Sequence, residues 1–193
     1  MAEFVVATYT VTPALCGGPM EMYQGSTVTN KCGQSFVPSV TCDLDSAVFG
    51  LSKLGTPPTG TIVARLYNAT GLYGTTSKPT GSAIAVSSTT ITPSTLSTTN
   101  ALYTFDFTGA NRVRLTPGNV YIISVELDSA SGGSSGVDSV LVDVGCSATD
   151  PGNFSYSYPS VGWTTLPAVQ AWDMTFTVYG VGPSTATIAW IKA

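Results

Sequence analysis

The sequence contains no histidine, and only 9% of its 193 residues are charged. Without histidine, Ser-His-Asp and Cys-His nucleophile systems and histidine metal sites are excluded. Only seven residues are Lys or Arg and they are scattered, which argues against nucleic acid as a partner because phosphate binding needs clustered basic groups. No apolar run approaches the roughly 18 residues that span a bilayer, so we expect no membrane insertion.

Hydrophobic residues nevertheless make up 43% of the chain, which excludes a disordered polar polymer. About a quarter of the residues are Ser or Thr, so hydroxyl groups must supply much of the solubility that charges supply elsewhere. The net charge is only −4. Such a weakly charged surface suits packing in a lattice or filament, or contact with a sugar.

Turn-forming Gly and Pro residues divide the chain into short pieces with the length of β-strands. Several pieces alternate apolar and polar side chains or are rich in β-branched and aromatic residues: Thr61–Tyr67, Ala101–Phe107, Val120–Leu127 and Asp173–Tyr179. No segment has a convincing helical period. We therefore predict an all-β fold, an antiparallel two-sheet β-sandwich of jelly-roll type with N- and C-terminal strand extensions.

The two ends of the chain differ from the central part. We predict an N-terminal arm over residues 1–30, the sandwich over residues 31–180 and a C-terminal strand extension over residues 181–193. Chain ends are ordered only when something holds them. We expect both ends to dock onto the body of the domain or onto neighbouring subunits by strand addition.

Four cysteines allow three pairings if all are oxidised. Their spacing matches no zinc-binding pattern. We favour a disulfide between Cys16 and Cys32, which would clip the N-terminal arm. Cys42 and Cys146 form either a second bridge or two buried free thiols.

Six segments in sequence order form a recognisable series: Gly33–Val37, Val48–Gly55, Gly60–Tyr67, Leu115–Ile123, Gly162-Trp163 and Asp173–Gly180. Together they resemble choice-of-anchor domains, the jelly-roll sandwiches of bacterial surface proteins and phage structural proteins, and the resemblance covers about three quarters of the chain. It implies a sandwich related in shape to carbohydrate-binding modules, without a catalytic motif. The cysteine-bearing arm and the extra C-terminal strand depart from the family pattern and indicate an assembly subunit.

Two pairs of acids, Asp43 with Asp45 and Glu126 with Asp128, are spaced to share one face of a strand, as a glycoside hydrolase could use them. Such spacings are common by chance, and we expect no enzyme. Calcium would fit the sequence better than zinc, because several acids that supply hard oxygen ligands lie near loops: Asp128, Asp138, Asp143 and Asp150. No EF-hand-like register supports it, so we predict no metal and no cofactor.

Aromatic residues gather in one Pro-rich segment near the C-terminal end. If exposed, their rings would form a glycan-binding platform, for which the candidates are Tyr156, Tyr158, Trp163 and Trp172. We favour the alternative that Phe154, Tyr156 and Tyr158 face one way along a strand and cover the core. Asn68-Ala-Thr70 and Asn153-Phe-Ser155 fit the glycosylation acceptor pattern, which arises often in a chain rich in Ser and Thr.

The prediction for function is a non-enzymatic structural protein of a virion, such as a capsid decoration or fibre-like subunit, or of a filament. It would pack against copies of itself or against a major shell or filament protein, in a virion or at an extracellular surface. Apolar side chains near the two ends would anchor these contacts: Phe4, Val6, Tyr9, Ile188, Trp190 and Ile191. The alternative is a carbohydrate-binding or adhesive module that uses the Tyr and Trp loops.

Overall fold

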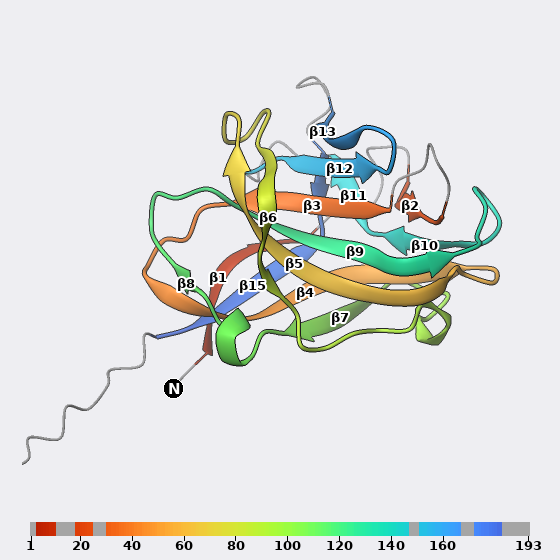
Figure 1. Cartoon of the computed structure of the whole chain (residues 1–193), viewed down its shortest axis with the longest axis horizontal. Coiled ribbons are helices and arrows are strands. Elements are labelled where there is room, and N and C mark those ends of the chain that lie inside the picture. Colours follow the sequence, from red (N-terminus) through yellow and green to blue (C-terminus); the bar gives the residue numbers. More distant parts are fainter. Residues whose placement is uncertain (1–2, 11–17, 25–29, 147–150, 167–171, 183–193) are drawn as a thin grey trace, which may run out of the picture.

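Two antiparallel sheets face each other in the computed structural model, which describes residues 3–10, 18–24, 30–146, 151–166 and 172–182 (Figure 1). The first sheet contains, in spatial order, β1 (Glu3–Tyr9), β15 (Phe176–Val181), β4 (Cys42–Leu54), β10 (Ser139–Val142) and β2 (Met20–Met22), while β7 (Ala101–Asp106) and β8 (Arg114–Leu115) also pair with β4. The second sheet contains β13 (Gly162–Thr165), β12 (Phe154–Tyr158), β3 (Lys31–Phe36), β9 (Tyr121–Ser131), β5 (Thr59–Thr70) and β6 (Lys78–Val86).

Two short strands, β11 (Val144–Cys146) and β14 (Trp172–Met174), form a separate pair. Two single-turn 3₁₀ helices, Pro93–Thr95 and Gly109–Asn111, lie in connections. An all-β antiparallel sandwich is thus confirmed, while the jelly-roll order of the strands stays a prediction. Within the ranges that the structure describes, no helix is long and apolar enough to cross a membrane.

The core lies between the sheets because successive side chains of a strand point to opposite faces. Along β9, Ile123 and Val125 are fully buried in this core, whereas the intervening Ser124 and Glu126 lie on the outer face of the second sheet. In β15, Phe176 and Val178 contribute to the same core, as the alternation in the sequence predicts. Full burial of each such side chain stabilises the folded state by about 1.5–3 kcal/mol relative to leaving it exposed.

The residues predicted as an N-terminal arm contain two strands of the sandwich itself. β1 pairs antiparallel with β15, and β2 pairs with β10. Met22 of β2 is fully buried, and Val6 of β1 is only 8% exposed. The N-terminal strand therefore docks onto the body of the domain. The predicted strand over residues 185–191 lies outside the described residues.

Two irregularities in strand pairing shape the outer face of the second sheet. Between Leu66 and Asn68 of β5 the pairing with β6 shifts, and the four residues of β6 from 81 to 84 lie opposite one residue of β5. A second bulge lies between Thr59 and Thr61 of β5, where the pairing with β9 shifts. Bulges bend strands away from the regular pleat. Here they flank one stretch of the sheet surface.

Candidate functional site

An open groove of about 640 Å³ lies on the outer face of the second sheet, between these two bulges. We call it the β9 groove. Its floor is formed by side chains from β3, β5 and β9: Lys31, Arg65, Tyr67 and Asp128. Its sides are formed by the β6 bulge, by Trp163 of β13 and by the end of β9 with nearby residues: Gly81, Ser82, Ala83, Leu127, Ser129, Ala130, Gln24 and Asn30.

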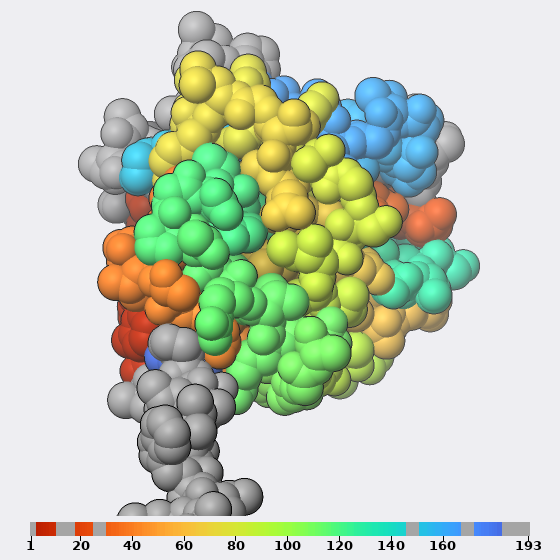
Figure 2. Space-filling view, turned by 60° about the vertical axis from the view of Figure 1, so that its left-hand side comes forward, coloured from red at the N-terminus to blue at the C-terminus, as the bar shows by residue number. Residues whose placement is uncertain are grey.

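The wall made by β6 follows from its sequence. Gly81 has a φ of 68°, a backbone conformation that favours glycine, and it starts the bulge after Thr80 has paired with Asn68. The bulged residues carry β6 toward β13, and the two strands are in contact. In Figure 2 the yellow-green atoms of β6 lie on the surface of the molecule beside the blue segment that contains β13.

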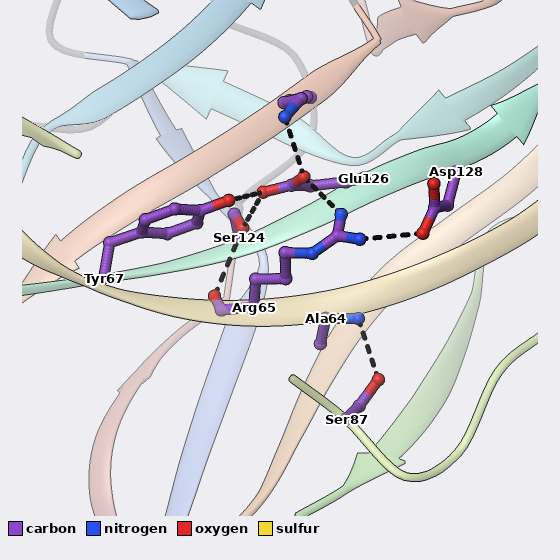
Figure 3. Close-up of polar contacts among 8 residues, drawn as sticks. Ala64, Arg65, Tyr67, Ser87, Ser124, Glu126 and Asp128 are labelled. Carbon is purple, nitrogen blue, oxygen red and sulfur yellow. Dashed lines mark hydrogen bonds and ion pairs between the residues drawn. The ribbon is translucent and has the colours of Figure 1, made fainter. Parts of the chain in front are cut away.

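A buried carboxylate, Glu126, contacts three of the floor residues, Lys31, Arg65 and Tyr67, without lining the groove itself. Its side chain is fully buried, and it accepts hydrogen bonds from the Tyr67 hydroxyl and the Ser124 hydroxyl, both at 2.8 Å (Figure 3). Arg65 Nη1 lies 2.6 Å from Glu126 Oε2, and Lys31 Nζ lies 3.1 Å from the same oxygen. Buried charges are tolerated when they are paired and hydrogen-bonded in this way. We call these five residues the Glu126 cluster.

Arg65 also holds a second carboxylate at the surface of the groove. Its Nη2 lies 2.7 Å from Asp128 Oδ2, so the one guanidinium bridges two acids on the same face of β9. The Arg65 side chain is 19% exposed and that of Asp128 is 47% exposed. The planar guanidinium fixes both carboxylates in position. Asp128 is consequently held rigidly while it still faces solvent.

The pKa shifts of Arg65 and Tyr67 agree with this geometry. Burial lowers the pKa of Arg65, but the charge and hydrogen bond of Glu126, together with Asp128, outweigh that effect and raise the pKa above its ordinary value. Burial, and after it the negative charge of Glu126, raises the pKa of the Tyr67 hydroxyl. Tyr67 therefore stays protonated and remains a hydrogen-bond donor to Glu126 at neutral pH.

Trp163 provides an aromatic surface at one side of the groove. Its ring contacts Tyr67 edge to face, with centroids 5.9 Å apart and planes at 68°. Beneath it lies Gly33 of β3, at which a Cβ atom would come within 2.8 Å of Ile122 and 3.4 Å of the indole ring. The absence of a side chain at Gly33 thus lets the half-buried indole lie close to the sheet.

Backbone strain also occurs in the groove. Ser129, which follows Asp128, has a φ of 52° and is the one residue other than glycine with positive φ in the described part of the chain. At the opposite side of the bulge, Gly60 has a φ of 101°, and a Cβ there would lie 2.7 Å from the Asp128 carbonyl oxygen. Strained, non-glycine residues of this kind cluster at binding sites. The bulge sets the direction of the chain directly after Asp128.

The predicted aromatic platform is split between the core of the sandwich and the outer face of the second sheet. Phe154 lies in the core, Tyr156 and Trp172 pack against it, and Tyr158 contacts Tyr156 at a centroid distance of 5.1 Å. Trp163 is opposite Ser157 in the register and lies on the outer face. Of the four candidates Tyr156, Tyr158, Trp163 and Trp172, only Trp163 lines the β9 groove.

The other carboxylates are dispersed. Asp43 accepts from Arg114, and Asp45 accepts from Arg112, on the first sheet. Two calcium candidates accept hydrogen bonds from protein groups at separate places: Asp138 from the Thr56 amide, and Asp143 from Asn100 and Thr175. Asp150 lies outside the described residues. In the described ranges no three Cys, Asp or Glu side chains gather as metal ligands.

Cys32 and Cys42 are buried free thiols. No disulfide is formed in the described part of the chain, and Cys16, the predicted partner of Cys32, lies outside it. The predicted clip therefore finds no support at its Cys32 end. For Cys42, the alternative of a buried free thiol is confirmed.

The predicted assembly anchors near the N-terminus serve the protein's own core. Val6 belongs to it, and Phe4 and Tyr9 pack against it partly buried. Ile188, Trp190 and Ile191 lie outside the described residues.

Sequence reasoning missed Lys31, Arg65 and Tyr67 as members of a site. A signal was present, because Arg65 and Glu126 are charged residues in the middle of strands that are otherwise strongly apolar. A charge at such a place needs a partner.

Comparison with protein-family models finds no match to this chain, and comparison with curated protein sequences finds none either.

Proposed function

We propose that this protein is a non-catalytic module that binds a carbohydrate in the β9 groove. The observation that carries the proposal is the combination, in one open groove, of the Trp163 ring with polar side chains that are fixed in place. Sugars present flat C–H faces and a rim of hydroxyl groups, so they are bound by aromatic rings together with oriented polar groups. The β9 groove offers both.

Preorganisation of the polar groups supports a binding role. Arg65 is held at two carboxylates, and Tyr67 is held between Glu126 and the Trp163 ring. Side chains that are already fixed lose little conformational freedom when a ligand arrives, and this raises affinity. The strained backbone of Ser129, next to Asp128, also supports preorganisation, because such strain persists only where the surrounding structure enforces it.

The same contacts argue against catalysis by the two acids on β9. A glycosidase needs one carboxylate that gives or takes a proton at the substrate. Glu126 is fully buried and already contacts two cations and two hydroxyl groups. Its place in the network is structural. A module of this kind would act where glycans are displayed, on a virion or at an extracellular surface.

The test is binding to an array of immobilised glycans by the wild-type protein and two variants. Trp163→Ala removes the ring and is expected to weaken retention at least about tenfold, as loss of a central aromatic contact does. Leu102→Ala is the matched control, because Leu102 is 69% exposed on β7 of the other sheet. Circular dichroism verifies the fold of both. Equal retention by Trp163→Ala and wild type would exclude the β9 groove as the site.

A second candidate function, an assembly subunit, is favoured by the edge position of β1. Within the described residues β1 has a neighbouring strand, β15, on one side only, and Val5 is 49% exposed. An open edge can accept a strand from another copy or from a shell or filament protein. The size distribution of the purified protein tests this: ordered assemblies that are lost on truncation after residue 182 support it, and a monodisperse full-length monomer contradicts it.

A further inference from the structure

The charges of the β9 groove neutralise one another. Two cations, Lys31 and Arg65, accompany two carboxylates, Glu126 and Asp128, so their formal charges sum to zero. Arg65 contacts both acids, and Lys31 contacts Glu126 at 3.1 Å. Each cation on the floor of the groove therefore already has a carboxylate partner.

This pairing disfavours an anionic ligand. To bind the carboxylate or sulfate of an acidic sugar, Arg65 would have to turn away from Glu126, which is fully buried and would lose a neutralising partner. The second acid adds to this effect. Asp128 is the more exposed of the two carboxylates, so it meets an incoming ligand first and repels a negative charge.

The same arrangement favours an uncharged ligand. A carboxylate offers about four lone-pair positions, and Arg65 Nη2 occupies one of them at Asp128 Oδ2. The remaining positions can accept hydrogen bonds from sugar hydroxyl groups, while the Trp163 ring covers an apolar sugar face. We infer that the ligand of the β9 groove is a neutral, hydroxyl-rich glycan, and that Asp128 both accepts its hydroxyl groups and rejects acidic sugars. This inference rests on the proposed function.

Affinity electrophoresis in native gels tests the inference. The gels contain either a neutral polysaccharide (β-glucan, mannan or galactan) or an acidic one (polygalacturonate, alginate or hyaluronate). We expect the wild-type protein to be retarded by at least one neutral polymer and by no acidic one. Its dissociation constant, measured in solution, should change less than about twofold between about 0.02 M and about 0.5 M salt, because no ionic contact is screened.

The variant Asp128→Asn keeps the shape of the side chain but removes its charge and its ion pair with Arg65. We expect its affinity for the neutral polymer to fall at least about fivefold, because an amide is a weaker acceptor than a carboxylate. The variant should also gain retardation by acidic polymers that disappears at high salt, because one end of the guanidinium is now free. Leu102→Ala is again the control and should behave as the wild type.

The negative results of these experiments distinguish failure of the neutral-ligand inference from failure of the proposed function. Retardation of the wild type by acidic polymers alone, lost at high salt, would overturn the neutral-ligand inference and leave glycan binding intact. Unchanged selectivity in Asp128→Asn would overturn the role given to Asp128. If neither class of polymer nor the glycan array retains the wild type, the proposed function fails and the inference fails with it.

Discussion

Arg65 and Glu126 lie on neighbouring strands of the second sheet and meet diagonally, with Nη1 and Oε2 2.6 Å apart and the carboxylate fully buried. A pair like this forms only when both strands are in register, since a shift of one residue would turn one of the two side chains into the core. It therefore fixes the alignment of β5 and β9 as well as the floor of the groove.

The first prediction concerns removal of the buried charge. Glu126→Gln keeps the size of the side chain but leaves Arg65 and Lys31 without their shared partner, and we expect the free energy of unfolding to fall by about 3 kcal/mol. Urea unfolding at neutral pH measures it. The control is Asp45→Asn, which affects an exposed pair with Arg112 and should change the free energy of unfolding by less than about 1 kcal/mol. Similar losses in both variants would contradict the special position of Glu126.

The second prediction concerns alkaline pH. Burial and Glu126 raise the pKa of Tyr67 in the folded state above its unfolded value near 10. The stabilisation linked to this shift is thus fully present below about pH 10 and is lost as pH rises toward the folded pKa. The free energy of unfolding of Tyr67→Phe should be about 1–2 kcal/mol lower than that of the wild type at neutral pH, because a hydrogen bond to a charged group is removed.

Above about pH 10 the free energy of unfolding should decrease less steeply in Tyr67→Phe than in wild type. Cys32, whose pKa is also raised by burial and then by Glu126, is present in both proteins, so their difference isolates Tyr67. Urea unfolding at a series of pH values provides the comparison. Parallel pH profiles would show that Tyr67 is not the group responsible.

The third prediction uses the strained backbone at Ser129. With a φ of 52°, this residue should be replaced favourably by glycine, and Ser129→Gly should raise the free energy of unfolding by about 1 kcal/mol. Ser129→Ala keeps a Cβ atom and hence the strain, so it should give no gain. Thermal unfolding of both variants measures the difference. A loss of stability in Ser129→Gly would mean that the hydroxyl group contributes more than the strain costs.

Which side chains face the core could be predicted from the sequence. The period of two in Asp173–Tyr179 is a local property, and a sandwich must bury one face of each strand. The same argument favoured Phe154, Tyr156 and Tyr158 as core-covering rings; Phe154 lies in the core and Tyr156 packs against it.

The β9 groove could not be predicted in this way. Lys31, Arg65 and Glu126 come from three strands far apart in the sequence, and they meet only through the strand order β3-β9-β5. The bulges at Gly60 and Gly81 also depend on long-range register. Likewise, the segment that contains Val6 and Tyr9 has the sequence of an apolar edge strand. Such a sequence is the same whether the strand pairs with its own sheet or with another subunit.

The fourth prediction concerns the cysteines. Cys32 is fully buried beneath the sheet, and its pKa is raised, so its thiol should be protonated and slow to react. In the native protein, iodoacetamide should leave Cys32 unmodified, and after denaturation without reductant it should be alkylated as a free thiol. Peptide mass spectrometry detects both states. Recovery of Cys32 in a disulfide with Cys16 would contradict this prediction and restore the N-terminal clip.

The fifth prediction separates the two asparagines in glycosylation acceptor patterns. Asn153 is 9% exposed, its amide donates to the Ser77 carbonyl at 2.9 Å, and its side-chain oxygen accepts from the hydroxyl groups of Ser35 and Ser77. Asn153→Ala would leave the buried hydroxyl and carbonyl groups of Ser77 without these partners. We therefore expect the free energy of unfolding to fall by about 2–3 kcal/mol.

The matched variant is Asn68→Ala, because Asn68 is exposed in β5, and its effect should be within about 0.5 kcal/mol. Urea unfolding compares the two. The different burial of the two side chains also decides which site a glycosylating host could modify. A glycan on Asn153 would replace an amide hydrogen that points into the protein. Mass spectrometry of protein from such a host should therefore find a glycan at Asn68 only. Occupancy at Asn153 would mean that the strand β12 is not held by this asparagine.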